Sequence, residues 1–160
     1  MTAPGITTNW LAALRRYLGV SLAGHFIWEI LHLPLYTLWT TGTFGQKAFA
    51  VAHCTIGDAM IAGLSVLVAL AFFGHAMWPR ANAARVYAVT VALGIAYTIY
   101  SEWMNTSVRG SWSYSDLMPI LPVTRTGLSP LLQWIVVPAL ALGFAAGGVP
   151  WKNQGANVRA

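Results

Sequence analysis

The sequence predicts an all-α integral membrane protein, a four-helix bundle whose helices run up-down-up-down. Charged residues make up only 8% of the 160 residues and hydrophobic ones 57%, whereas an ordinary soluble domain carries about 25% charged residues. Most of the surface is therefore expected to face lipid. The hydrophobic residues fall into four segments, and each membrane crossing takes roughly 20 residues. The chain thus has room for a single transmembrane domain, residues 1–160.

Four apolar segments are predicted to cross the membrane as helices, at about residues 17–39, 46–73, 85–105 and 128–146. A hydrocarbon core about 30 Å thick offers no water to the backbone, so a crossing segment must satisfy its own hydrogen bonds, as a helix does. The turn at residues 40–45 and the loop through Pro79, Arg80 and Asn82 make consecutive helices antiparallel neighbours.

The nine Lys and Arg residues lie singly or in pairs at the ends of the apolar segments, which indicates membrane topology and no nucleic-acid partner. Basic residues concentrate on the cytoplasmic side of membrane proteins. Their distribution predicts cytoplasmic N and C termini in a bacterial inner membrane. One side carries Arg15, Arg16, Arg80, Arg85, Lys152 and Arg159, and the other carries Lys47, Arg109 and Arg125.

The third connection, from about Thr106 to Gly127, is longer than the others and is predicted to be an outer loop. It carries Trp112 and Tyr114, and two interpretations of these aromatic residues stay open. Their rings are typical of the depth of the lipid headgroups. A long ordered loop in a compact bundle also suggests a lid over an opening.

Ionisable residues inside the apolar segments are the main functional signal. Three of the four acidic residues and three of the four histidines lie there, although an ionisable side chain at membrane depth costs several kcal/mol unless it is paired or hydrated. Such residues mark function by default. The six are His25, Glu29, His32, His53, Asp58 and Glu102.

The first segment gathers three of these residues on one helical face. His25, Glu29 and His32 are spaced i, i+4 and i+7, which places them within about 60° of arc. Ser21, Tyr36 and Trp39 extend the same stripe, so this face is expected to point into the bundle. Pro34 removes an amide donor and is expected to kink the helix beside the cluster.

On the second segment, His53 and Asp58 point about 140° apart on an ideal helix. Either Gly57 allows local unwinding, or only one of the two belongs to the site and Asp58 faces another helix. His53 lies as deep as His32, about 10 Å from the outer end of its helix.

Histidine nitrogens and carboxylate oxygens together suit zinc, iron, manganese or copper, and bundles build such sites from facing helices. No buried Lys or Arg is expected to balance the carboxylates, so a cation must do so. Cys54, the only cysteine, excludes an internal disulfide. We therefore expect a divalent transition metal in an enzyme that acts on a small lipophilic, membrane-borne substrate. The expected metal ligands are His25, Glu29, His32, His53 and Glu102, and the expected catalytic residues are Glu29, Glu102 and Asp58.

Three alternatives remain open. Two histidines on different helices, His25 or His32 with His53, suit haem in an electron-transfer subunit. A metal-free isomerase would move protons between His25, Glu29 and Glu102. The His25-x-x-x-Glu29 spacing resembles that of the sterol isomerases of the emopamil-binding family, which implies such acid-base chemistry. In the third alternative, the polar groups only hold the helices together, in a monomer or a homo-oligomer.

In the fourth segment, Gln133, Trp134 and Pro138 are the only breaks in the aliphatic run that follows Ser129 and Pro130. The Gln133 amide is expected to bond either into the site or, as we prefer, to a neighbouring helix. Ser129 and Pro130 predict the start of this helix, with the serine as N-cap and the proline in the first turn.

Overall fold

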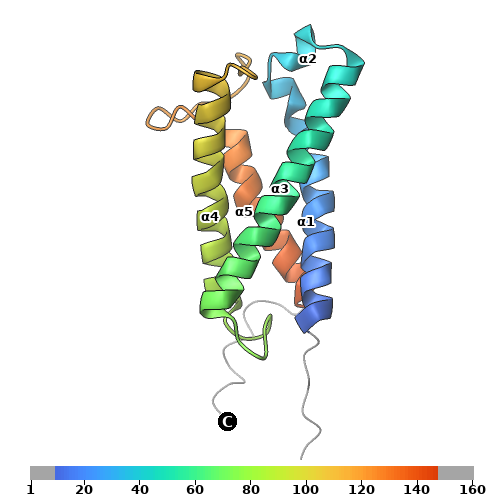
Figure 1. Ribbon diagram of the computed structural model, residues 1–160, viewed down its shortest axis with the longest axis vertical. Coiled ribbons are helices and arrows are strands. Elements are labelled where there is room, and N and C mark those ends of the chain that lie inside the picture. Colours follow the sequence, from blue (N-terminus) through green and yellow to red (C-terminus); the bar gives the residue numbers. More distant parts are fainter. Residues whose placement is uncertain (1–9, 148–160) are drawn as a thin grey trace, which may run out of the picture.

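The computed structural model describes residues 10–147, and this part of the chain is helical apart from its connections (Figure 1). Four helices are long and apolar enough to cross a membrane, as predicted. They are α1 (Trp10–His32), α3 (Phe44–Phe73), α4 (Ala83–Trp103) and α5 (Leu128–Ala145). Lys152 and Arg159, used in the charge count, lie outside the described residues.

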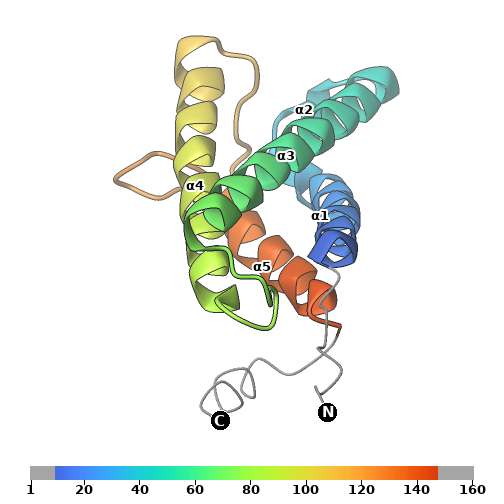
Figure 2. The same cartoon turned by 60° about the horizontal axis from the view of Figure 1, so that its bottom comes forward.

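Successive long helices run in opposite directions, and each packs against two others. Helix α1 contacts α3 and α5, and α4 contacts the same two helices. Figure 2 shows α3 crossing obliquely between α1 and α4. We call the end that carries the short helix α2 (Leu38–Thr41) and residues 109–127 the upper end, and the end with residues 74–82 the lower end.

The outer surface of the bundle is apolar and the interior is in part polar, the reverse of a soluble bundle. Leu31, Met60 and Phe72 are at least 70% exposed, as expected of side chains that face lipid. At the lower end the interior is a hydrophobic core built around Tyr17, Trp78 and similar buried residues. Towards the upper end, buried polar and charged residues replace this core.

The first predicted span begins earlier and ends earlier than residues 17–39. Helix α1 starts at Trp10 and ends at His32, where the chain continues as the 3-10 turn η1 (Leu33–Leu35) and the extended residue Tyr36. The cause is Pro34, which has no amide hydrogen to continue the helix. Helix α3 then begins with a capping box in which Thr43 and Gln46 bond each other's backbone.

Two further boundaries differ from the prediction. Helix α4 continues through the π-helical turn η2 (Met104–Val108), so the long connection to α5 starts at Arg109. Ser129 is not the N-cap of α5, because the helix begins at Leu128 and Gly127 occupies the cap position. The Ser129 hydroxyl is therefore free to bond other side chains.

A close approach of α4 to α5 depends on Gly94. A Cβ atom at this position would overlap the indole ring of Trp134, a residue that is almost fully buried. The two helices could not keep this separation with any larger residue at position 94.

The change Gly94→Ala is expected to lower the thermal stability of the purified protein in detergent. Overpacking of this kind costs typically about 1–3 kcal/mol, because Trp134 or the helix backbone must move. Gly143→Ala is the matched control, since its Cβ would meet nothing within 4 Å and alanine favours a helix by about 1 kcal/mol. Equal melting temperatures for the two variants would contradict the close contact.

Candidate functional site

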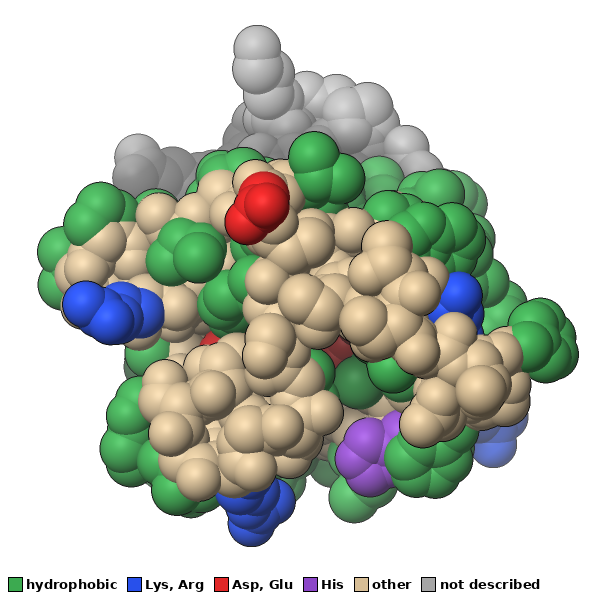
Figure 3. All heavy atoms as spheres, turned by 90° about the horizontal axis from the view of Figure 1, so that it is seen from above, with side chains coloured by type: hydrophobic (Ala, Val, Ile, Leu, Met, Phe, Trp, Pro, Cys, Tyr) green, Lys and Arg blue, Asp and Glu red, His purple; other side chains and the backbone are tan. Residues whose placement is uncertain are grey.

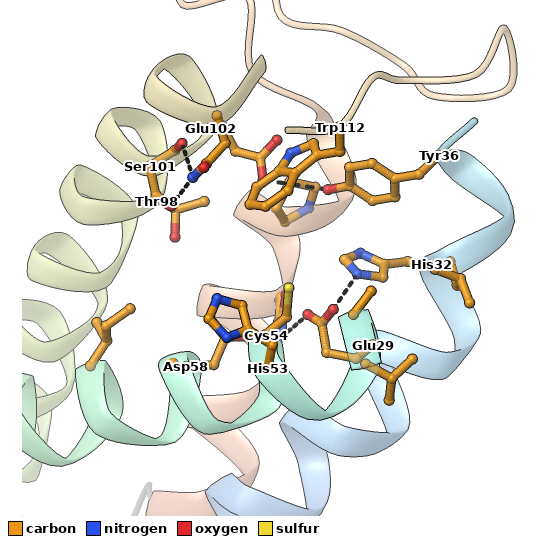
Figure 4. A pocket seen from close by; sticks show the side chains of 18 of the residues that line it. Glu29, His32, Tyr36, His53, Cys54, Asp58, Thr98, Ser101, Glu102 and Trp112 are labelled. Atoms are coloured by element: carbon orange, nitrogen blue, oxygen red, sulfur yellow. Dashed lines mark hydrogen bonds and ion pairs between the residues drawn. The ribbon is translucent and has the colours of Figure 1, made fainter. Parts of the chain in front are cut away.

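A cavity of about 290 Å³ opens among the four long helices towards the upper end. Seen from that end, a hollow lies between the helices and acidic side-chain atoms are visible inside it (Figure 3). Its polar lining includes Glu29, Asp58 and Glu102, which come from α1, α3 and α4 (Figure 4). A cavity of this size is at the lower end of the range for small-molecule sites, roughly 300–1,000 Å³.

On the wall formed by α1, Glu29 and His32 form a hydrogen-bonded pair that is extended by Ser129 of α5. His32 Nε2 lies 3.1 Å from Glu29 Oε2, and His32 Nδ1 lies 3.2 Å from Ser129 Oγ. The Trp28 indole donates to the same Ser129 oxygen at 3.2 Å. Ser129 can then donate to Nδ1, which leaves the hydrogen of a neutral His32 on Nε2, directed at Glu29. Both ring nitrogens of His32 are thus engaged.

The Gln133 amide of α5 joins the groups below this pair. Its nitrogen donates to Asp58 Oδ2 at 2.8 Å and to Glu29 Oε1 at 3.2 Å. It also lies 2.9 Å from Nδ1 of His25. An amide nitrogen carries two hydrogens, so when both carboxylates accept them His25 Nδ1 must bear a hydrogen of its own. That hydrogen can reach Asp58 Oδ2, which is 3.5 Å away.

On the wall formed by α4, Glu102 receives hydrogen bonds from two phenols. The Tyr114 hydroxyl donates to Oε2, and the Tyr36 hydroxyl donates to Oε1 at 3.5 Å. Burial, and then the proximity of Glu102, raises the pKa of both phenols. Tyr36 and Tyr114 therefore stay protonated and remain donors throughout the physiological pH range.

Residues 109–127 are held over the cavity by the chain that follows α1. Because Pro34 ends the helix, backbone groups beyond it are left for other partners. Thr37 N donates to the Ser113 carbonyl at 3.0 Å, and Ser115 N donates to the Leu35 carbonyl at 2.9 Å. Trp112 lines the cavity from this segment. The segment thus borders the cavity through Trp112 and is fixed to the chain that follows α1.

The structure brings some of the predicted residues together and separates others. Glu29, His32, His53, Asp58 and Glu102 all line the cavity. His25 does not line it; this side chain is fully buried behind Gln133, with its ring 5.2 Å from that of Trp134.

The two predicted site residues of α3 both line the cavity although the helix is unbroken at Gly57. Local unwinding at Gly57 is thus not needed for both residues to line the cavity. The second interpretation was right in part, because Asp58 faces another helix. His53 is exposed and stacks on Phe49, with 5.5 Å between the ring centres. Asp58 is mostly buried and bonds across the bundle to Gln133.

The five expected metal ligands do not form one coordination sphere. Within residues 10–147, no three His, Cys, Asp or Glu side chains are grouped as the ligands of a metal ion would be. Of the five, Glu29 and His32 are in direct contact. His32 uses both nitrogens on protein groups, and His25 lies outside the cavity. For the same reasons, His32 would have to break a hydrogen bond, and His25 would have to reach the cavity, before either could bind a haem iron.

Sequence reasoning undervalued two residues of α5. Gln133 was expected to bond either into the site or to a neighbouring helix, and its amide does both, at the centre of a network that was not expected. Ser129 was expected to be a cap, yet it bonds His32. The available signal was the isolation of Gln133, a lone amide in an aliphatic span.

Comparison with models of protein families, with curated proteins and with solved structures finds no match to this chain. The chemistry of the site must therefore be argued from its geometry. A carboxylate held by two phenols lies on one wall of the cavity, and two carboxylates paired with imidazoles lie on the others. Such a set can accept a proton on one side and donate one on another.

Replacing Gln133 by leucine is expected to destabilise the protein strongly. Leucine has a similar size but leaves Glu29, Asp58 and His25 without their shared partner, and a buried polar group left unpaired costs about 1–3 kcal/mol, more if it is charged. The melting temperature in detergent measures the loss. Ile135→Leu, at a lipid-facing position of the same helix, is the control. A Gln133→Leu variant as stable as this control would show that the network does not hold the helices.

Removing the Tyr114 hydroxyl with Tyr114→Phe is expected to loosen residues 109–127. The variant loses the bond to Glu102 and the one accepted from Gly127 N. Because a hydrogen bond to a charged group is worth about 1.5–3 kcal/mol, exchange of the Ser115 and Gly127 amides with deuterated water should speed up about tenfold. Tyr100→Phe, on an exposed face of α4, should leave this exchange unchanged. Unaltered exchange in Tyr114→Phe would contradict the lid contact.

Proposed function

We propose that this protein is a membrane enzyme that transfers protons to and from a small lipophilic substrate by general acid-base catalysis. The observation that carries the proposal is that Glu102 shares one cavity with Glu29 and Asp58, although the three carboxylates come from three different helices. The two phenols donate to Glu102, and imidazoles accompany the other two carboxylates.

Glu102 is the proposed base. Its carboxylate takes a proton from the substrate and becomes a carboxylic acid, while the two phenols hold it in place. The His32 and Glu29 pair is the proposed acid: in the active form it holds one proton more than a neutral imidazole and a carboxylate, and it returns this proton at another atom of the substrate. The proton left on Glu102 then passes back to the pair, which restores the starting state. Removing one proton and adding another leaves the substrate with the same atoms and electrons, so the proposed reaction class is isomerisation and needs no redox partner.

The cavity wall supports a lipophilic substrate. Between the ionisable groups lie Leu33, Val51, Ile61, Tyr97 and Trp134. Apolar and aromatic walls with a few polar groups are typical of sites that orient a mostly apolar molecule. The exposed hydrophobic side chains around the bundle are consistent with a substrate that enters the cavity from the lipid.

The distribution of basic residues supports a bacterial inner membrane with the upper end on the outer side. Arg80 and Arg85 flank the lower end of the bundle, and Arg15 and Arg16 lie near the same end of α1. Under the positive-inside rule this end is cytoplasmic. The proposed site then lies in the outer half of the membrane.

We favour acid-base chemistry over a metal centre because two of the three imidazoles, those of His25 and His32, already bond protein groups. A metal ion on His32 would have to displace Glu29 or Ser129, and one on His25 would have to reach a side chain behind Gln133. The proposal assigns the charge balance of the site to protons shared between these imidazoles and the carboxylates.

Solvent deuterium provides a test that works while the substrate is still unidentified. The purified protein is placed in nanodiscs with a total lipid extract of bacterial membranes in deuterated water, and apolar components are analysed by mass spectrometry. Wild-type protein should introduce deuterium into at least one component. Because a general base contributes about 10²-fold or more, Glu102→Gln should lower the rate by this factor.

Asp116→Asn is the matched control, since Asp116 is exposed in the outer loop and does not line the cavity. It should label lipids as fast as wild type. The proposal fails if no component gains deuterium above protein-free nanodiscs, or if Glu102→Gln is as active as Asp116→Asn. Stoichiometric metal that is lost in Glu102→Gln would favour the metalloenzyme instead.

A further inference from the structure

The buried face of α1 is polar well below the cavity. From Tyr17 to His32, every buried residue of the helix carries a polar side-chain atom. Four of them, Tyr17, Ser21, His25 and Glu29, follow each other at intervals of four residues, or about one turn of 5.4 Å. A helix packed only by apolar contact would place aliphatic residues on this face.

Several polar atoms on this path have no hydrogen-bond partner among residues 10–147. They belong to side chains that are at most 1% exposed, so they are shielded from both lipid and bulk water. An unpaired buried polar group costs about 1–3 kcal/mol, and buried polar groups that lack a protein partner are commonly satisfied by internal water. The atoms are Tyr17 OH, Ser21 Oγ, His25 Nε2, Trp78 Nε1 and Thr90 Oγ1.

The residues that carry these atoms are distributed from the lower end of the bundle up to the site. The Tyr17 phenol lies close to Ser21 without a hydrogen bond of good geometry. Tyr17 and Trp78 belong to the same buried cluster, and Trp78 lies in the connection at the lower end. Thr90 faces the interior from α4, one turn above the cluster residue Val86.

His25 links this path to the proposed site. Its Nδ1 lies against Gln133 and Asp58, whereas its Nε2 is buried with no described partner. With the hydrogen of a neutral ring on Nδ1, Nε2 is a bare acceptor that needs a donor. Internal water commonly supplies such a donor to buried polar groups.

We propose that Tyr17, Ser21, His25, Thr90 and Trp78 hold a file of internal water molecules, and that this file carries protons between the lower end of the bundle and the cavity. Each water or hydroxyl along the file accepts one proton and releases another, so its own number of protons is unchanged. His25 accepts a proton on Nε2 and releases one from Nδ1 to Asp58, which leaves the hydrogen of the ring on Nε2. A turn of the ring restores the starting arrangement before the next transfer. The use of these protons in catalysis rests on the proposed function, whereas the presence of the file does not.

Radiolytic footprinting tests the file directly. Short X-ray pulses convert bound water to hydroxyl radicals, which modify adjacent aromatic and histidine side chains. In nanodiscs, wild-type Tyr17 and Trp78 should be modified although they are buried. Tyr100, which is 54% exposed on the lipid-facing side, should be modified severalfold less because lipid excludes water there.

Valine and threonine have the same shape, so placing each of them at position 21 tests the role of the Ser21 hydroxyl. Ser21→Val should lower the modification of Tyr17 severalfold, whereas Ser21→Thr, which keeps a hydroxyl, should retain it. Thr90→Val provides a second test, since valine has the shape of threonine and folding is expected to survive. The file is overturned if Tyr17 and Trp78 stay unmodified in wild type, or if valine and threonine at position 21 give equal modification. Glu102→Gln should leave the footprint unchanged, so failure of the catalytic proposal is distinguishable from failure of the file.

Discussion

The Gln133 amide is the interaction on which the upper half of the bundle depends. It connects α5 to Glu29 of α1 and Asp58 of α3 through hydrogen bonds of 3.2 Å and 2.8 Å. Lipid cannot solvate carboxylates, so they must find partners within the protein. One amide with two hydrogens serves both acids, and the geometry of the cavity follows from the positions in which it holds them.

Pro34 is the second constraint, and it acts through the backbone. It ends α1 beside the ionisable cluster and leaves the chain extended at Tyr36. The groups released there pair with Ser113 and Ser115 of the outer loop, so a break in one helix fixes the segment that covers the cavity. Tyr36, in this extended stretch, also donates a hydrogen bond to Glu102.

Much of the fold was predictable because lipid imposes simple rules on length and composition. Three of the four spans were located to within a few residues, and the inward face of α1 followed from helical periodicity. The grouping of the side chains was not predictable. Spacing along one helix fixes a face, but it does not fix the rotation or height of the neighbouring helix that supplies Gln133 or Ser129. The polar path through Ser21 was overlooked because hydroxyls barely alter the hydrophobic pattern of a span.

Cys54 gives the protein a built-in reporter. This only thiol of the chain lines the same cavity wall as His53 and Asp58 and is partly accessible. A lipophilic maleimide would thus attach at one defined place, next to the carboxylates. Any molecule that fills the cavity would shield the sulfur, so alkylation kinetics of the unaltered protein can screen candidate compounds for occupancy before their chemistry is known.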